Sequence, residues 1–352
     1  MKSDAVVGCL LGTAVGDALG LPYEGIGPRR LRKMFPELGR HHFLLGHGMI
    51  SDDTEHTCFV AQATLSARGD PDEFERLLAR SLRWWLVGVP AGVGLATLRA
   101  CLRLWKGIPP ARSGVFSAGN GPAMRSALLG VAYGDEPAIL REHVLRSTRI
   151  THSDPKAFHG ALAVALAAHR SSFHAAVAPA DYLALVRTQL SDNGAADLLA
   201  VMEKATLSAA KGDPLSTFAA SIGCGKGISG YIFHTVPCVV QTWLRHQDDY
   251  HAGMEEILAA GGDTDTTAAI LGGITGAGVG RQGIPAEWLA GIAEWPRTVA
   301  WMTGIGECLA SALDGDPAIR PPSLFVPGIA VRNVAFTTVV LVHALRRLAP
   351  PY

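Results

Sequence analysis

Hydrophobic side chains recur at helical spacing along most of this sequence. Six alanine- and leucine-rich segments carry apolar residues at positions i, i+3 and i+4, which predicts amphipathic helices. These segments are Phe74–Leu86, Pro137–Ser147, Ala157–His169, Ala180–Leu190, Ala195–Ala210 and Phe336–Leu348. The pairs Asp154-Pro155 and Asp213-Pro214 are typical helix starts, because proline suits the first helical turn. Strand-like alternation is hard to find, so we expect an all-α fold.

The first residues need separate treatment because they imitate an export signal. Lys2 precedes the apolar stretch Ala5–Gly16, and Cys9 imitates a lipoprotein site. Asp4 interrupts the basic region, and the helical pattern continues past any plausible cleavage point. We therefore expect a helix of the folded protein rather than a leader.

Composition points to one large core. The chain has 352 residues, of which 48 % are hydrophobic and 18 % charged, against about 25 % charged in an average protein. No linker, charge block or strict repeat divides it, so we expect a single domain over residues 1–352. The 40 glycines exceed the roughly 25 of average usage, and they predict tight turns and close backbone approaches.

The charge balance argues against two classes of partner. Lysine and arginine number 31, as do aspartate and glutamate, whereas nucleic-acid binders carry a basic excess. The longest uncharged stretch, 227–244, contains His234, Pro237 and Gln241 and is a poor membrane span. We expect neither a nucleic-acid nor a membrane partner. Six scattered cysteines without a CxxC pair predict buried free thiols and a cytoplasmic location.

Two acidic clusters carry the candidate chemistry. Ser51-Asp52-Asp53-Thr54-Glu55 and Gly262-Asp263-Thr264-Asp265-Thr266 each lead into an apolar run, which predicts a helix start. Capping by one Ser, Thr or Asp side chain is the simpler interpretation of either cluster. Each cluster, however, supplies three or more oxygen-bearing side chains in a row, which is more than one cap requires.

We expect these clusters to meet in the folded chain. Asp263 and Asp265 can converge only if the backbone there is still a turn, which Gly261 and Gly262 permit. Carboxylates about 5 Å apart repel by roughly 3 kcal/mol per pair at an effective dielectric near 20. Protonation or bound cations must relieve that repulsion. All-oxygen donors suit Mg²⁺ or Mn²⁺, and four carboxylates would neutralise two such ions.

The same motifs carry a resemblance. Gly12–Gly20, Ser51–Thr54, Thr151–Pro155 and Gly262–Thr266 resemble, in order and spacing, the ADP-ribosylglycohydrolase family. The stretch Gly119–Arg125 is most similar to the branch that includes the dinitrogenase-reductase-activating glycohydrolase. The resemblance implies an all-α fold with a dinuclear Mg²⁺ or Mn²⁺ centre in a cleft.

The resemblance also implies roles for individual residues. The metal ligands would be Ser51, Asp52, Asp53, Asp263, Asp265 and Thr266. Serine at position 51 departs mildly from the family, which usually has threonine there. Asp53 would be the first choice for proton transfer, and Glu24 matches a family acid that can gate the metals. The residues that would hold ADP-ribose are Gly119, Asn120, Gly121, Met124, His152 and Tyr231.

The implied reaction is removal of ADP-ribose from a modified protein side chain, by cleavage of the glycosidic bond at the distal ribose. The branch of closest resemblance favours an arginine linkage. Serine-linked ADP-ribose, poly(ADP-ribose) and modified nucleic acid are alternatives. A catalytically silent, crystallin-like ADP-ribose binder and a dinuclear phosphoesterase on an unrelated helical fold are two further hypotheses.

Several candidates have simpler structural interpretations. Glu24 could be a solvated loop acid, His152 a structural cap and Tyr231 a core residue. Asp17 lies on the first predicted helix and could cap a neighbouring turn, so we leave it out of the site. Two further sets are expected to have no role in the site. They are the loop histidines His41, His42 and His47, expected in solvent, and Trp84, Trp85 and Trp105, expected in the core.

Overall fold

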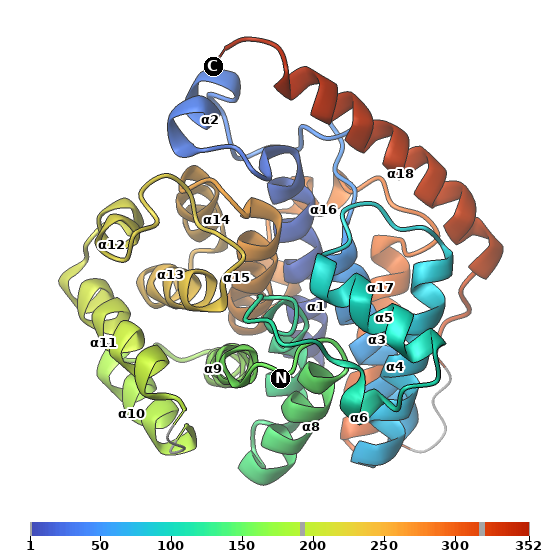
Figure 1. Ribbon diagram of the computed structural model, residues 1–352. Helices are drawn as coiled ribbons and strands as arrows, with labels where there is room; N and C mark the ends of the chain where they lie inside the picture. Colours follow the sequence, from blue (N-terminus) through green and yellow to red (C-terminus); the bar gives the residue numbers. More distant parts are fainter. Residues whose placement is uncertain (1, 191–193, 317–320, 352) are drawn as a thin grey trace.

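Helices make up all regular secondary structure in the computed structural model, which describes residues 2–190, 194–316 and 321–351 (Figure 1). Within these residues there is no β-strand, and only isolated bridges pair extended backbone. The all-α prediction is confirmed.

The longer helices comprise a central pair and the helices that lie on both sides of it. They are α1 (Lys2–Gly20), α3 (Asp52–Ala67), α4 (Pro71–Val87), α5 (Leu95–Trp105), α8 (Pro137–Arg149), α9 (Pro155–Ser171), α10 (Pro179–Gln189), α11 (Ala196–Lys211), α13 (Ile232–Arg245), α14 (Tyr250–Ala259), α15 (Thr264–Val279), α17 (Val299–Leu313) and α18 (Val326–Arg347). Shorter turns of helix connect them. They are η1 (Leu21–Tyr23), α2 (Pro28–Met34), α6 (Pro110–Ser113), η2 (Ala123–Arg125), α7 (Ala127–Tyr133), α12 (Leu215–Ser221), η3 (Arg281–Gly283) and α16 (Ala286–Ala290).

The six predicted helices are all present. Five of them correspond to α4, α8, α9, α10 and α11, and α9 begins at Pro155 after an Asp154 cap, as predicted. The sixth, Phe336–Leu348, is only the second half of α18, which begins at Val326. Its first turn contains Pro327 and Gly328, two residues that obscured the helical pattern there.

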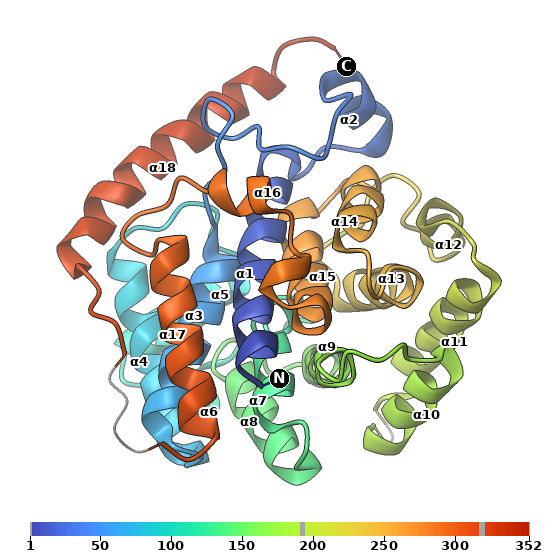
Figure 2. The same cartoon turned by 180° about the vertical axis from the view of Figure 1, so that it is seen from behind.

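The central pair is α1 and α15, which lie side by side in the middle of the molecule (Figure 2). A Cβ atom added to Gly12 would lie 2.1 Å from the carbonyl oxygen of Gly272, so only glycine permits this approach. The same close contact recurs every four residues along α1, at Gly8, Gly12, Gly16 and Gly20. The helices are antiparallel, and Thr264 Oγ1 donates to the carbonyl of Gly20 at 2.8 Å. The end of α1 therefore lies beside the start of α15.

Two helices are long and apolar enough to cross a membrane by length and composition, α1 extended to Tyr23 and α18, each with a mean hydropathy of 1.6. The sequence reasoning tested other stretches and missed both. The α1 segment is wholly buried, as a core helix is, whereas α18 is 22 % buried. The outer face of α18 exposes Val331, Val334, Leu341 and Leu345.

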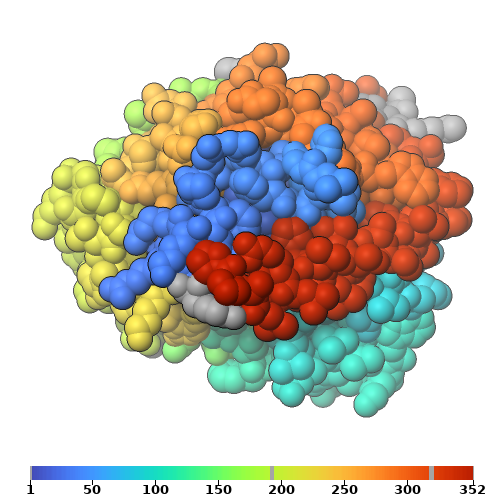
Figure 3. Space-filling view, turned by 90° about the horizontal axis from the view of Figure 1, so that it is seen from above, coloured from blue at the N-terminus to red at the C-terminus, as the bar shows by residue number. Residues whose placement is uncertain are grey.

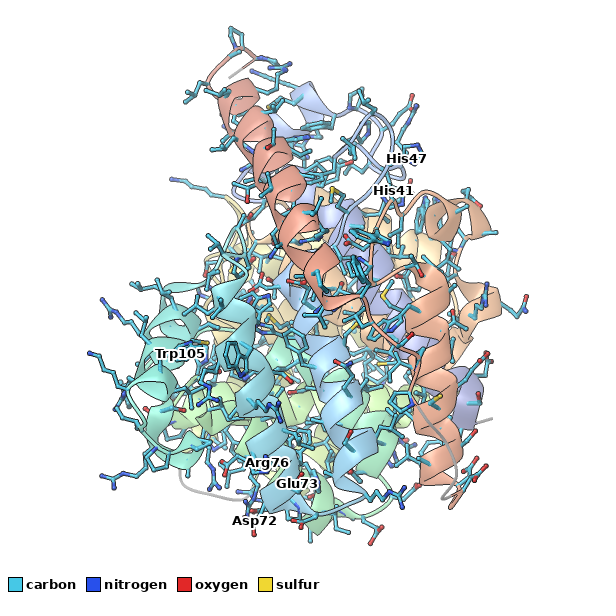
Figure 4. All side chains as sticks on the ribbon, turned by 90° about the vertical axis from the view of Figure 1, so that its right-hand side faces the viewer. His41, His47, Asp72, Glu73, Arg76 and Trp105 are labelled. Atoms are coloured by element: carbon cyan, nitrogen blue, oxygen red, sulfur yellow. The ribbon has the colours of Figure 1, made fainter. Side chains whose placement is uncertain are left out.

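Some smaller expectations need correction. Trp84 and Trp105 were expected in the core but are 53 % and 43 % exposed, and Figure 4 shows Trp105 at the surface. His41 is buried, and its Nε2 lies 2.8 Å from the carbonyl of Trp288, whereas His47 is exposed as expected. None of the six cysteines forms a disulfide bond, and Cys308 alone is half-buried rather than buried.

Candidate active site

The structure brings the two acidic clusters together. The first lies at the start of α3, where Ser51 Oγ accepts a hydrogen bond from the N–H of Asp53 at 3.3 Å. The second lies at the start of α15, where Asp263 occupies the capping position. Thr266 Oγ1 donates to Asp53 Oδ2 at 3.2 Å, and Ser51 Oγ donates to the same oxygen at 3.2 Å. One carboxylate oxygen thus joins two segments that are far apart in the sequence.

Asp17 on α1 orients the first cluster. Its Oδ2 accepts hydrogen bonds from the N–H of Ser51 at 2.8 Å, the N–H of Thr54 at 3.1 Å and Thr54 Oγ1 at 2.5 Å. Asp17 therefore caps a neighbouring helix, as the sequence suggested, while its Oδ1 is buried without a hydrogen-bond partner among the described residues. Burial raises its pKa to about 6 despite these donors.

A glycine turn orients the second cluster. Gly261 and Gly262 have φ values of 66° and 90°, which side-chain-bearing residues rarely adopt. The backbone N–H of Gly262 donates to the carbonyl of Ile26 at 2.9 Å, and the backbone N–H of Asp263 donates to the carbonyl of Ile228 at 2.7 Å. This clamp keeps Asp263 outside the first turn of α15, so its carboxylate can approach that of Asp265, as the spacing predicted.

The glycine–asparagine loop is joined directly to the acids. Asn120 Nδ2 donates to Asp263 Oδ2 at 2.6 Å and lies 3.0 Å from Thr235 Oγ1 on α13. The backbone N–H of Asn120 donates to the carbonyl of Gly230 at 3.0 Å. The predicted diphosphate loop and the predicted metal ligands therefore form one continuous surface.

His152 lies beneath this loop. Its ring is buried, and Cβ atoms built on Gly119 and Gly121 would approach ring atoms to 3.1 and 3.0 Å. Its Nδ1 lies 2.9 Å from Thr151 Oγ1. Burial and the positive charge of Arg125 lower its pKa to about 3, so the imidazole is neutral at physiological pH. His152 supports the loop without adding a charge to it.

Arg125 is a positioning residue that the sequence reasoning missed. Its side chain is fully buried, and its guanidinium donates to the carbonyl of Gly121 at 3.0 Å, the carbonyl of Ser147 at 2.8 Å and Thr151 Oγ1 at 2.8 Å. It thus links the loop to the Thr151–Pro155 motif. The sequence did contain a signal for it. Arg125 follows Pro122-Ala123-Met124 and precedes an apolar run, which suggests that it is buried, and a buried arginine needs hydrogen-bond partners inside the protein.

The two remaining substrate candidates differ in exposure. Tyr231 is half-buried, its hydroxyl lies 3.5 Å from Lys156 Nζ, and its ring packs edge-on against His234. It therefore has an open edge that a core residue would lack. Met124 is buried behind the loop, and its carbonyl accepts a hydrogen bond from Thr57 Oγ1 at 3.2 Å. The structure places Met124 as support for the loop rather than on the open surface.

The site concentrates negative charge in a desolvated place. Burial, reinforced by neighbouring carboxylates, raises the pKa of Asp52, Asp53 and Asp265 well above the usual range. Asp53 Oδ1 is buried without a hydrogen-bond partner among the described residues. A buried acceptor of this kind requires a proton or a cation, and the surrounding donors are all oxygens. The residues present therefore fit a hard divalent cation.

The carboxylates are not already gathered into a tight cage. Within the described residues, no three His, Cys, Asp or Glu side chains are close enough to form a metal cluster by themselves. The described residues therefore show no preassembled carboxylate cage, and the divalent-cation centre stays a prediction.

Glu24 and helix α18 form the outer wall of the site. Glu24 is exposed at the rim; desolvation and then the charge of Asp263 raise its pKa, and Arg347 opposes them. A small cavity of about 70 Å³ separates these acids from α18. Its wall includes Glu24, Ser51, Asp52, Asp265, His343 and Arg347. The sequence reasoning had given α18 no role here.

Comparison with known proteins agrees with this geometry. The model of the family described as ADP-ribosylglycohydrolase matches residues 1–318. The chain belongs to the ADP-ribosylglycohydrolase family. It is therefore an ADP-ribosylglycohydrolase, and the phosphoesterase hypothesis on an unrelated fold falls away.

Three relatives and one solved structure illustrate the range of this family. An uncharacterized protein of Archaeoglobus fulgidus is 32 % identical, over 81 % of this chain and 90 % of its own. The ADP-ribosyl-[dinitrogen reductase] glycohydrolase of Rhodospirillum rubrum is 28 % identical, over 82 % of this chain and 90 % of its own. The ADP-ribosylhydrolase ARH3 of Gallus gallus is 26 % identical, over 80 % of this chain and 87 % of its own. A structure described as an ADP-ribosylglycohydrolase-related protein complex superposes with a TM-score of 0.67 and 27 % identity, covering 89 % of this chain and 99 % of that one.

Proposed function

We propose that this chain is a divalent-cation-dependent hydrolase that removes ADP-ribose from arginine side chains of modified proteins. The observation that carries the proposal is the hydrogen bond between Thr266 Oγ1 and Asp53 Oδ2, which unites the two acidic clusters. The family contains hydrolases of ADP-ribosylated substrates, and one relative acts on ADP-ribosyl-dinitrogen reductase.

Two Mg²⁺ or Mn²⁺ ions would be held by the oxygens of both clusters, namely Ser51, Asp52, Asp53, Asp263, Asp265 and Thr266. When bound, such ions supply a fixed template for the ribose hydroxyls and lower the pKa of a water molecule. The unpartnered Oδ1 of Asp53 supports a cation at this place rather than a purely structural cap.

The residues of the chain would perform the proton transfer. Cleavage of the bond to the distal ribose passes through an oxocarbenium-like transition state, so nearby carboxylates stabilise the developing positive charge. In this proposal Asp53 takes a proton from water; the fixing of its Oδ2 by Thr266 and Ser51 and the unpartnered Oδ1 support that role. Glu24, at the exposed rim, would face the leaving side chain.

The remaining site residues would orient the substrate. The backbone N–H groups of Gly119–Gly121 suit a diphosphate, and the fixed position of Asn120 against Asp263 brings that loop beside the acids. The half-exposed ring of Tyr231 offers a stacking edge for the adenine end. His152 and Arg125 hold the loop from below.

The charge of the site favours a cationic leaving group. Glu24 lines the cavity wall and is not among the proposed metal ligands, so its charge is available to the leaving group. A guanidinium is better stabilised beside such a carboxylate than a neutral serine hydroxyl. This physical preference agrees with the arginine linkage implied by the branch of closest resemblance.

The test is release of ADP-ribose, followed by mass spectrometry, from one arginine-modified and one serine-modified protein. We expect wild type to prefer the arginine-linked substrate. Asp53→Asn and Asp265→Asn should each lower the rate at least about a hundredfold, and Asp181→Asn, an exposed aspartate on α10, should not. Preference for the serine-linked substrate would overturn the linkage. Wild-type rates in both site variants would overturn the mechanism.

A further inference from the structure

The last helix lies beyond the family match and against the acids. The family model ends at residue 318, whereas α18 spans Val326–Arg347. Figure 3 shows α18 in red across one face of the molecule, between the blue N-terminal segments and the cyan region that includes α5. The cavity beside the acidic clusters is walled by α18 on one side and by Asp52 and Asp265 on the other.

The first half of α18 is fastened to the base of the site. Arg332 forms a buried ion pair with Glu294, with Nε–Oε1 and Nη2–Oε2 distances of 2.8 and 2.9 Å. Arg332 also donates to the carbonyl of Ile50, the residue before Ser51, and Glu294 accepts the N–H of Ile50 at 3.2 Å. The position of α18 is therefore linked to the start of the first acidic cluster.

The second half of α18 packs against residues of the first fifty positions of the chain. Phe336 packs against Phe43 with ring centroids 5.5 Å apart, in a small hydrophobic cluster separate from the main core. His343 Nε2 lies 2.7 Å from the carbonyl of Phe43. Arg30 donates to the carbonyls of Arg347 and Pro351 at the end of the helix. This half depends on fewer apolar contacts than the core helices, because most of α18 is exposed.

One side chain of α18 brings a positive charge to the acids. Arg347 lines the cavity with Glu24 and Asp265, and its Nη2 lies 3.4 Å from the carbonyl of Pro22. The charges of both carboxylates act on its guanidinium, whose Nε is buried without a hydrogen-bond partner among the described residues. The other charge facing it is that of Arg30. Arg346, the next residue back, is exposed and donates to the carbonyl of Pro350 at 2.9 Å. Two adjacent arginines thus differ in whether they reach the site.

We propose that α18 is an internal strap that holds the guanidinium of Arg347 where the guanidinium of an arginine-linked substrate would lie, so that the closed chain occupies its own leaving-group site. This inference rests on the proposed function for the identity of the leaving group. The cavity of about 70 Å³ is smaller than a modified protein side chain, so in this proposal α18 moves outward when a substrate enters. The strap would also repel divalent cations, since it places a positive charge beside their ligands.

Calorimetric titration of Mn²⁺ tests the charge of the strap without relying on catalysis. We expect Arg347→Gln to bind Mn²⁺ about tenfold more tightly than wild type, because a neighbouring cation is removed. Arg346→Gln, the matched control with the same charge change, should stay within about twofold of wild type. Arg347→Lys, which keeps the charge, should also resemble wild type. Equal affinity of Arg347→Gln and Arg346→Gln would overturn the proposal.

Methylguanidinium tests the identity of the occupant. Metal-free Arg347→Gln has a guanidinium-sized space beside Glu24 and Asp265, so millimolar methylguanidinium should raise its melting temperature by about 2 °C or more. Wild type and Arg346→Gln should show no rise beyond that given by tetramethylammonium, a cation of different shape. No selective rise in Arg347→Gln would overturn the internal-substrate assignment. These readouts stand even if wild type fails to cleave an arginine-linked substrate, which would overturn only the proposed function.

Discussion

A single aspartate oxygen connects the two halves of the candidate site. Asp53 Oδ2 accepts from Ser51 and from Thr266, so it belongs to both clusters, while Oδ1 is left without a partner among the described residues. Asp17 Oδ2 is likewise held, by three donors of the α3 cap, and its Oδ1 is also buried without a partner among the described residues. Burial raises the pKa of both groups, but of the two only Asp53 is hydrogen-bonded to both acidic clusters.

Asn120 provides a test of the electrostatics at this scale. In Asn120→Asp the donor that lies 2.6 Å from Asp263 Oδ2 becomes a second carboxylate. The negative charge of Asp263 raises the pKa of the new carboxyl group in the folded state. The variant should therefore lose stability as pH rises above about 3.9, the pKa of an aspartate in the unfolded chain. We expect a free energy of unfolding about 2–4 kcal/mol below wild type at pH 8 and a much smaller deficit at pH 4.5, by urea titration. A deficit that does not change with pH would contradict the contact.

The sequence reasoning foresaw these acids but not their supports. Asp53, Asp263 and Asp265 stood out because consecutive oxygen-bearing residues after a glycine turn exceed what a cap requires. Arg125 was overlooked although its apolar neighbours in the sequence suggested burial, whereas nothing in a single sequence shows that Arg347 is drawn toward distant carboxylates.

At the scale of elements, the α1–α15 pair fixes the distance between the acids. The glycine stripe on α1 allows the backbones to touch, and the pair ends at Gly20 and Thr264, next to Glu24 and Asp265. A change that separates these helices would therefore disturb the site as well as the core.

Gly12→Ala tests the helix contact. Its new Cβ would lie 2.1 Å from the Gly272 carbonyl oxygen, and backbone cannot move aside as a side chain can. We expect a loss of roughly 3 kcal/mol in the free energy of unfolding. Gly304→Ala on α17 is the matched control, because its nearest neighbour, Pro322 Cγ, is 3.5 Å away. The control should be neutral or stabilising by up to about 1 kcal/mol. Equal effects of the two changes would contradict the close packing.

Glu256 on α14 joins two further helices and predicts an acid-dependent stability. It accepts from Arg245 at the end of α13, from the N–H of Leu215 at 2.8 Å at the start of α12, and lies 2.7 Å from His246 Nε2. Burial alone would raise its pKa, but these donors prevail and lower it from 4.5 to about 2. A lowered folded pKa stabilises the protein above pH 4.5, and that stability is lost as pH falls toward 2.

Glu256→Gln should therefore cost roughly 3 kcal/mol at pH 7, an amount that shrinks steadily below pH 4.5. Urea unfolding at several pH values measures this difference. Glu287→Gln, an exposed glutamate on α16, should show no such trend. A pH-independent deficit in Glu256→Gln would show that the carboxylate is not held as described.

For the whole molecule, the fold class followed from periodicity, and the arrangement of the chain around its acids followed from the family resemblance. Five of six predicted helices were correct in extent, because their apolar residues repeat without interruption. The closing position of α18 could not be foreseen, since it depends on ion pairs such as Arg332–Glu294 that link segments far apart in the sequence. In Figure 4 the N-terminal loop that carries His41 and His47 lies beside α18.

The most direct test of the account is a double-mutant cycle of Mn²⁺ binding, measured by calorimetry on wild type, Asp53→Asn, Asp265→Asn and the double variant. A shared centre predicts two ions per wild-type chain and a severe loss in either single variant. The double variant should then bind Mn²⁺ no more weakly than the single variant with the lower affinity, because both changes damage the same site. Strictly additive losses, with each variant losing one ion independently, would contradict the shared centre, as would a wild-type chain that binds no Mn²⁺.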